Sequence, residues 1–163
     1  VVGKIVIQAA PAAIGAILAN KQLGKAGRSE MTREAGASYP AELFLMSAGA
    51  LFLALNVAPT EEMALIGYRM TPLHALALVA ISLLALHALA STVGFAGHEA
   101  HEQPGLAFFH FTLPGYGLAL ALSLYALWTF GQLEGAGINE IVRSTVVLGF
   151  PAALGAAVAR LLV

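Results

Sequence analysis

The chain has 163 residues, of which 59% are hydrophobic and only 10% are charged. Soluble domains average about 45–50% apolar and about 25% charged residues, so this composition excludes an ordinary soluble domain. A formal net charge of −1 provides no basic surface for nucleic acid, and the lack of cysteine excludes disulfides and thiolate metal sites. Lipid is therefore the expected surrounding of most of this surface.

Hydropathy predicts an all-α, polytopic transmembrane helix bundle with about five spans. Their residue ranges are 1–19, 39–57, 72–95, 105–130 and 141–163. Each range is long enough to cross a bilayer as a helix that rises about 1.5 Å per residue. The first span carries Lys4 and Gln8 and is interrupted by Pro11. An amphipathic helix buried in a larger bundle is therefore the alternative for this segment.

Basic residues gather between the first and second spans and predict the orientation of the chain. They are Lys21, Lys25, Arg28 and Arg33. By the positive-inside rule we expect the loop 20–38 to be cytoplasmic. Alternation of the spans then places the connection 58–71 outside and Arg160 inside. Glu42 lies near the cytoplasmic start of the second span, where we expect it to be solvated.

The nine residues Pro11–Ala19 are similar to Pro151–Ala159, with the proline and a glycine at matching positions. This match predicts that 1–19 is the last helix of a first repeat, and that 39–163 forms a second, four-helix repeat within one transmembrane domain, 1–163. An even number of helices in each unit makes the two units parallel, with most of the first unit missing. A chance match in an alanine-rich chain is the alternative.

Two motifs carry a family resemblance that covers nearly the whole chain. Residues 56–62 read Asn-Val-Ala-Pro-Thr-Glu-Glu, and residues 149–156 read Gly-Phe-Pro-Ala-Ala-Leu-Gly-Ala. Both resemble a bacterial family of integral membrane proteins that has no assigned function. The resemblance implies a helical membrane fold and a longer N-terminal part, and it implies no activity.

A polar break follows the second predicted span. Pro59 removes a backbone donor and should end the helix near Val57. Thr60 is then the expected N-cap of a short helix, with Glu61 and Glu62 in its first turn. One interpretation is a capped interfacial helix with solvated acids. The other is a cation or proton site at a helix break, made by Glu61 and Glu62 together with Asn56 and Thr60.

The later spans contain further polar candidates. His110, Tyr116 and Arg143 are candidates to line a cavity around the kink expected at Pro114. The alternative for Pro114 is an accommodated kink whose freed carbonyl is met by a neighbouring group.

Histidines raise the question of haem and metal. The spacing of His74 and His87 puts them on opposite faces of one helix, so they cannot bind one haem together. A pair of His87 with His110 is geometrically open, but an interhelical hydrogen bond of His87 is the preferred interpretation. The loop histidines His98 and His101 are metal candidates whose spacing is one residue short of the zincin pattern. We expect no haem or other cofactor.

These features predict a membrane transporter or channel for a small cation or protons, which uses the Glu61 and Glu62 pair. The alternative is a non-catalytic scaffold or accessory subunit that forms a homo-oligomer or joins a larger membrane complex. No phosphate-binding loop or nucleophile elbow occurs, so we do not expect an enzyme. Acids that face a cavity would favour transport, whereas solvated acids would favour the scaffold.

Overall fold

The computed structural model describes residues 39–92 and 108–161, and this part of the chain is helical and contains no strand. Its elements are α2 (Tyr39–Val57), α3 (Glu61–Arg69), α4 (Pro72–Thr92), the π-helix η1 (Phe108–Thr112), α6 (Leu113–Thr129) and α7 (Ile138–Leu161). Within the described residues, 4 helical segments are long and apolar enough to cross a membrane, and the third of them joins η1 to α6. The predicted span 1–19, and with it the repeat, lies outside the described residues.

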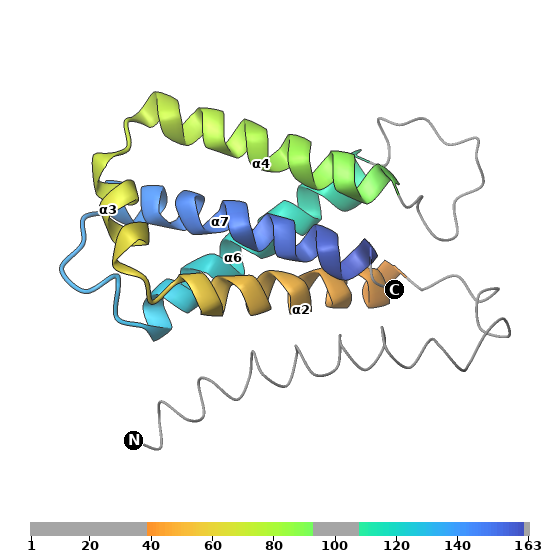
Figure 1. Cartoon of the computed structure of the whole chain (residues 1–163), viewed down its shortest axis with the longest axis horizontal. Helices are drawn as coiled ribbons and strands as arrows, with labels where there is room; N and C mark the ends of the chain where they lie inside the picture. Colours follow the sequence, from red (N-terminus) through yellow and green to blue (C-terminus); the bar gives the residue numbers. More distant parts are fainter. Residues whose placement is uncertain (1–38, 93–107, 162–163) are drawn as a thin grey trace, which may run out of the picture.

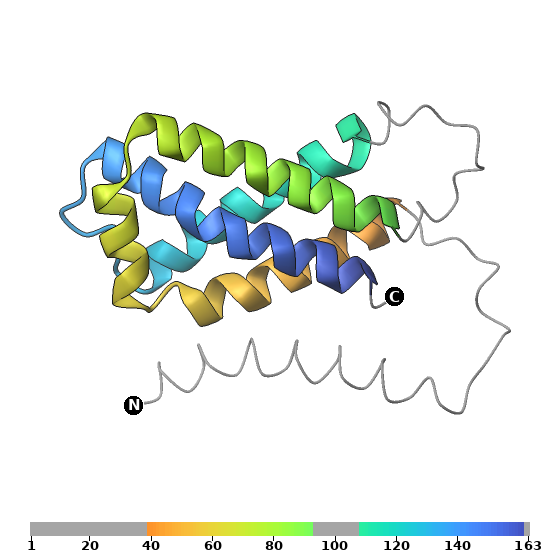
Figure 2. The same ribbon diagram turned by 45° about the horizontal axis from the view of Figure 1, so that its top comes forward.

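The four long segments run side by side and alternate in direction along the chain, while α3 crosses one end of the bundle (Figures 1 and 2). Helix α7 is central, because it packs against α2, α3, α4 and α6. We call the end that holds α3 and the turn 130–137 the α3 end. The opposite end, where α2 begins and α7 finishes, is the Arg160 end.

Prolines set the helix boundaries near the α3 end, as the sequence predicts. Helix α2 ends at Val57, two residues before Pro59, and α4 begins at Pro72. At a first helical position the missing N–H of proline is not needed. Helix α7 begins at Ile138, three residues earlier than expected. The cause is Glu140, whose Oε2 accepts a hydrogen bond of 3.0 Å from the Gly137 N–H and so caps the first turn.

Pro114 lies in the first turn of α6, directly after the π-helix. Because proline has no N–H, the His110 carbonyl loses the donor that a regular helix would supply four residues later. The Tyr39 hydroxyl of α2 donates to this carbonyl at 2.9 Å. The neighbouring group expected at this kink is therefore Tyr39.

Replacing Tyr39 with phenylalanine should lower the free energy of unfolding by about 1 kcal/mol, because the His110 carbonyl loses its donor from α2. Thermal unfolding of the protein in detergent measures the loss. Tyr125→Phe is the matched control, since the Tyr125 side chain is exposed on α6. Equal midpoints for the two variants would mean that this hydrogen bond does not stabilise the bundle.

Small residues bring α2 and α7 into backbone contact. A Cβ placed on Gly49 would collide with the carbonyl oxygen of Gly155, and a Cβ on Gly155 would collide with the carbonyl oxygen of Gly49. Around this contact, α7 buries a series of alanines: Ala152, Ala153, Ala156, Ala157 and Ala159. Gly155 and the buried alanines of α7 therefore form a helix-packing face.

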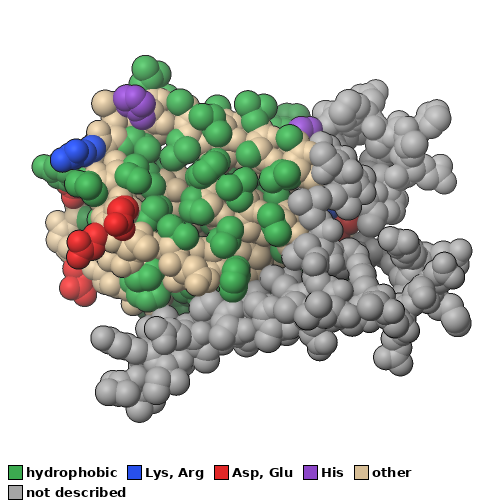
Figure 3. Space-filling view, in the orientation of Figure 1, with side chains coloured by type: hydrophobic (Ala, Val, Ile, Leu, Met, Phe, Trp, Pro, Cys, Tyr) green, Lys and Arg blue, Asp and Glu red, His purple; other side chains and the backbone are tan. Residues whose placement is uncertain are grey.

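Apolar side chains spread over the visible face of the bundle between its two ends (Figure 3). Exposed examples are Phe44, Leu73, Leu76, Ile81, Leu84, Leu124 and Val142. Exposed Tyr39, Tyr68 and Trp128 lie near helix ends, at the level expected for an interfacial aromatic belt. Hydroxyl groups within the spans, such as those of Ser82 and Ser123, donate to the carbonyl one turn earlier in their own helix. The exposed surface of the bundle, apolar between its ends and aromatic near them, therefore suits lipid.

Candidate functional site

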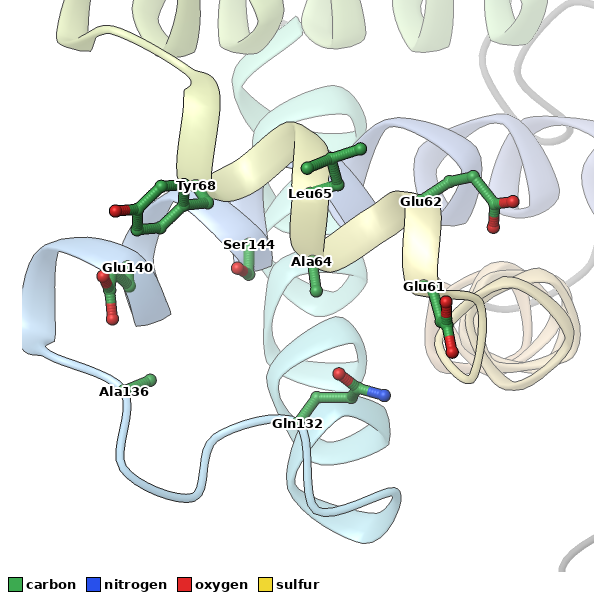
Figure 4. A pocket seen from close by; sticks show the side chains of 9 residues that line it. All are labelled: Glu61, Glu62, Ala64, Leu65, Tyr68, Gln132, Ala136, Glu140 and Ser144. Carbon is green, nitrogen blue, oxygen red and sulfur yellow. The ribbon is translucent and has the colours of Figure 1, made fainter.

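A cavity of about 540 Å³ lies at the α3 end of the bundle. It is lined by Glu61, Glu62, Ala64, Leu65, Tyr68, Gln132, Ala136, Glu140 and Ser144. Figure 4 shows it between α3 and the turn that carries Gln132, with Glu140 entering from the start of α7. We call it the acidic pocket, because three carboxylates from two helices line it.

All three carboxylates of the acidic pocket lie in the first turn of a helix: Glu61 and Glu62 in α3, and Glu140 in α7. The positive end of the helix dipole stabilises an ionised carboxylate there by about 0.3–1 kcal/mol. The side chains of Glu61 and Glu62 are exposed, whereas Glu140 is half-buried. The pocket is therefore a negatively charged surface that water reaches.

The carboxylates do not converge on one point. In Figure 4 the side chains of Glu61 and Glu62 leave α3 at one end, while Glu140 lies beside Tyr68 at the other. Within 39–92 and 108–161, no group of three or more histidine and acidic side chains is close enough together to hold a metal ion. The pocket can attract cations by its charge, but it does not form a ready cage for a metal.

Thr60 is the N-cap residue of α3, as predicted, but its side chain does not cap the helix. The hydroxyl instead donates to the Val57 carbonyl at 2.9 Å. Asn56 is exposed, and its Nδ2 donates to the Phe52 carbonyl at 2.6 Å. Neither residue is among those that line the acidic pocket. Of the four residues predicted to form a site at the helix break, only Glu61 and Glu62 line the acidic pocket.

Glu42 is not solvated, and this expectation from the sequence was wrong. Its side chain is buried at the Arg160 end, and its Oε2 lies 3.6 Å from Nη2 of Arg160, which is buried as well. Glu42 lies in the first turn of α2 and Arg160 in the last turn of α7, and these two helices run antiparallel. Burial is acceptable here because each charge compensates the other in surroundings where a lone charge would cost several kcal/mol.

Aromatic side chains extend this ion pair toward η1. The guanidinium carbon of Arg160 lies 5.0 Å from the ring centroid of Phe111, within the range of a cation–π interaction. The ring of Phe111 meets the Tyr39 ring edge to face, at 5.4 Å between centroids. His87 of α4 joins the same end, because its Nδ1 lies 2.9 Å from Oγ1 of Thr112. The preferred interpretation of His87, an interhelical hydrogen bond, is thus confirmed.

The three residues proposed for a cavity around Pro114 lie apart from one another, and none lines the acidic pocket. His110 is exposed on η1, and Arg143 is half-buried on α7. Tyr116 is buried in the core, where its hydroxyl faces Ser82 without reaching hydrogen-bonding geometry. His74 is exposed and contacts Thr71 through Nδ1 at 2.6 Å. The loop candidates His98 and His101 lie outside the described residues.

The whole chain, residues 1–163, matches the model of a family described as "Putative integral membrane protein (DUF2391)". The chain belongs to this family. No curated protein and no solved structure matches it. For this DUF2391 protein, the family description agrees with the four apolar helical segments and supplies no activity.

In this DUF2391 member, two features were not predicted from the sequence: the place of Glu140 in the acidic pocket, and the pairing of Glu42 with Arg160. Glu140 was not among the predicted site residues, although the predicted orientation already put it on the same side of the membrane as Glu61. Glu42 and Arg160 were likewise both expected at the cytoplasmic end. The signal for their pairing was the opposite charge of two residues just inside the same end of two spans.

Proposed function

We propose that this DUF2391 protein is a membrane transporter or channel for a small cation or protons, and that the acidic pocket is its entrance. The observation that carries the proposal is that Glu61, Glu62 and Glu140 all line one cavity at the end of a bundle with four candidate membrane spans. The proposed role is not enzymatic and needs no cofactor.

The charge of the pocket can concentrate cations without binding one tightly. A carboxylate about 7 Å away attracts a monovalent cation by about 0.6 kcal/mol in water, so three of them raise the local concentration roughly twentyfold without screening and about tenfold at low salt. At about 0.15 M salt the screening length is about 8 Å, and the enrichment falls. Dependence on ionic strength is therefore a property of this mechanism.

We further propose that the protein lies in a bacterial inner membrane with the loop 20–38 in the cytoplasm. The basic residues of that loop support this orientation through the positive-inside rule. The Arg160 end then faces the cytoplasm, and the acidic pocket opens to the other side. A cation outside the cell would meet Glu61, Glu62 and Glu140 first.

A non-catalytic scaffold, or an accessory subunit in a homo-oligomer or larger complex, is the second candidate. The exposure of Glu61 and Glu62 favours it, because solvated acids need no ligand. The apolar side chains that α4 exposes, among them Leu73, Leu76 and Leu84, could meet a helix of a partner as well as lipid. A measurement of flux separates the two candidates.

Flux of monovalent cations and of protons into liposomes that contain the purified protein tests the proposal. The triple variant E61Q/E62Q/E140Q should lower the flux about tenfold at low salt and by a smaller factor at about 0.15 M salt, because only the pocket charge is removed. E134Q is the matched control, since Glu134 is exposed on the neighbouring turn and does not line the pocket.

Loss of flux in the triple variant, with flux retained in E134Q, supports an acidic entrance. Equal flux in all three proteins would contradict the entrance. Absence of flux in the unmodified protein for every cation tested would reject transport and leave the scaffold.

A further inference from the structure

We infer that Glu42 and Arg160, together with Phe111 and Tyr39, form a gate that closes the end of the bundle opposite the acidic pocket. This inference rests on the proposed transport function and deepens it by naming residues that block the path. We call these four residues the Arg160 gate.

The Arg160 gate joins helices that are distant in sequence. Glu42 and Tyr39 come from the first turn of α2, Arg160 from the last turn of α7, and Phe111 from η1. The ion pair connects α2 to α7, the ring of Phe111 connects α7 to η1, and the Tyr39 hydroxyl connects α2 back to the His110 carbonyl. The contact between His87 and Thr112 attaches α4 to the same end. All four spans therefore meet there.

The two ends of the bundle differ in their access to water. At the α3 end the carboxylates of Glu61 and Glu62 are exposed around a cavity of about 540 Å³. At the Arg160 end the side chains of Glu42 and Arg160 are 5% and 7% exposed. The described residues thus expose charged side chains at one end of the bundle and bury them at the other, and we take this asymmetry as one state of an alternating-access transporter.

An ion pair suits a gate because its charges are satisfied in both states. When the gate is closed, Glu42 and Arg160 compensate each other inside the protein. When the helices separate, water enters and hydrates both charges, which offsets the lost attraction. Apolar side chains in the same places would gain nothing from entering water. The attraction between Glu42 and Arg160 therefore favours the closed state, while hydration of the two charges keeps the open state accessible.

Access of a reagent to a buried cysteine tests the Arg160 gate directly, because the chain has no cysteine of its own. Ala156 lies one turn below Arg160 on α7 and is fully buried, so A156C reports opening of this end. Ala58 is buried at the far end of the bundle, so A58C reports general loosening. The full chain in nanodiscs is labelled with a membrane-impermeant maleimide, and the rate is measured for each reporter.

The variant E42Q/R160Q removes both charges of the gate. It should be labelled at least tenfold faster than the parent at A156C and at an unchanged rate at A58C. The control R69Q/E134Q also removes one base and one acid, at exposed positions away from the gate, and should change neither rate. The reversed pair E42R/R160E keeps an ion pair, so it should be labelled at A156C within about threefold of the parent rate.

An unchanged rate at A156C in E42Q/R160Q would overturn the gate, as would an equal rise at A58C. If E42Q/R160Q does not fold, the reversed pair decides: slow labelling at A156C supports the gate, and fast labelling contradicts it. Labelling does not depend on flux. Unchanged labelling in a protein that still shows flux would therefore reject the gate alone. Absence of flux in a protein whose Arg160 end opens would reject the transport proposal alone.

Discussion

Gly49→Ala should lower the free energy of unfolding by about 2–3 kcal/mol, although it adds only one methyl group. At this position a Cβ meets the carbonyl oxygen of Gly155 and the Cβ of Ala159. A backbone carbonyl cannot turn aside as a flexible side chain can, so α2 and α7 must move apart. Because α7 is central to the bundle, this movement also loosens the packing of the other helices.

Gly117→Ala is the control that separates this collision from the helix preference of alanine. Gly117 lies within α6, and a Cβ placed there would have no neighbour within 4 Å. Alanine at such a position should raise stability by up to about 1 kcal/mol, because it favours the helix over the unfolded chain. Unfolding by denaturant in a mild detergent measures both variants. A similar change in both would show that the contact between Gly49 and Gly155 is not tight.

The helices could be predicted from sequence because their signals are local. Long apolar runs gave the positions of α2, α4, α6 and α7, and Pro59 followed by Thr60 gave the start of α3. Backbone geometry at a proline or a cap depends on residues a few positions away, so one sequence suffices. The side chain of Thr60 could not be predicted in this way, since a carbonyl of the preceding turn and the N–H groups of α3 compete for it.

The pairing of Glu42 with Arg160 was missed because it depends on which helices are neighbours. Hydropathy predicts that α2 and α7 cross the membrane, but not that they pack against each other. That choice depends on the contact between Gly49 and Gly155, which brings the first helix of the described bundle against the last. The same holds for Glu140. Its side of the membrane could be predicted, but its position near α3 depends on which helices pack against each other.

Glu42→Gln alone should lower the free energy of unfolding by about 3–5 kcal/mol, and Arg160→Gln should have a similar effect, because each removes the opposite charge beside the other buried side chain. This is the largest effect that the structure predicts for a single side chain. Loss of the cation–π contact with Phe111 adds a smaller amount to the Arg160 variant, about 0.5–2 kcal/mol.

The double variant E42Q/R160Q decides whether the charges act as a pair. With both charges gone, neither member of the pair remains charged beside a neutral partner, so the double variant should be more stable than either single variant by at least about 2 kcal/mol. Unfolding in the same detergent gives the four values of the cycle. If the two losses simply add, Glu42 and Arg160 are stabilised by other groups. In that case their separation would not be the step that opens the Arg160 end.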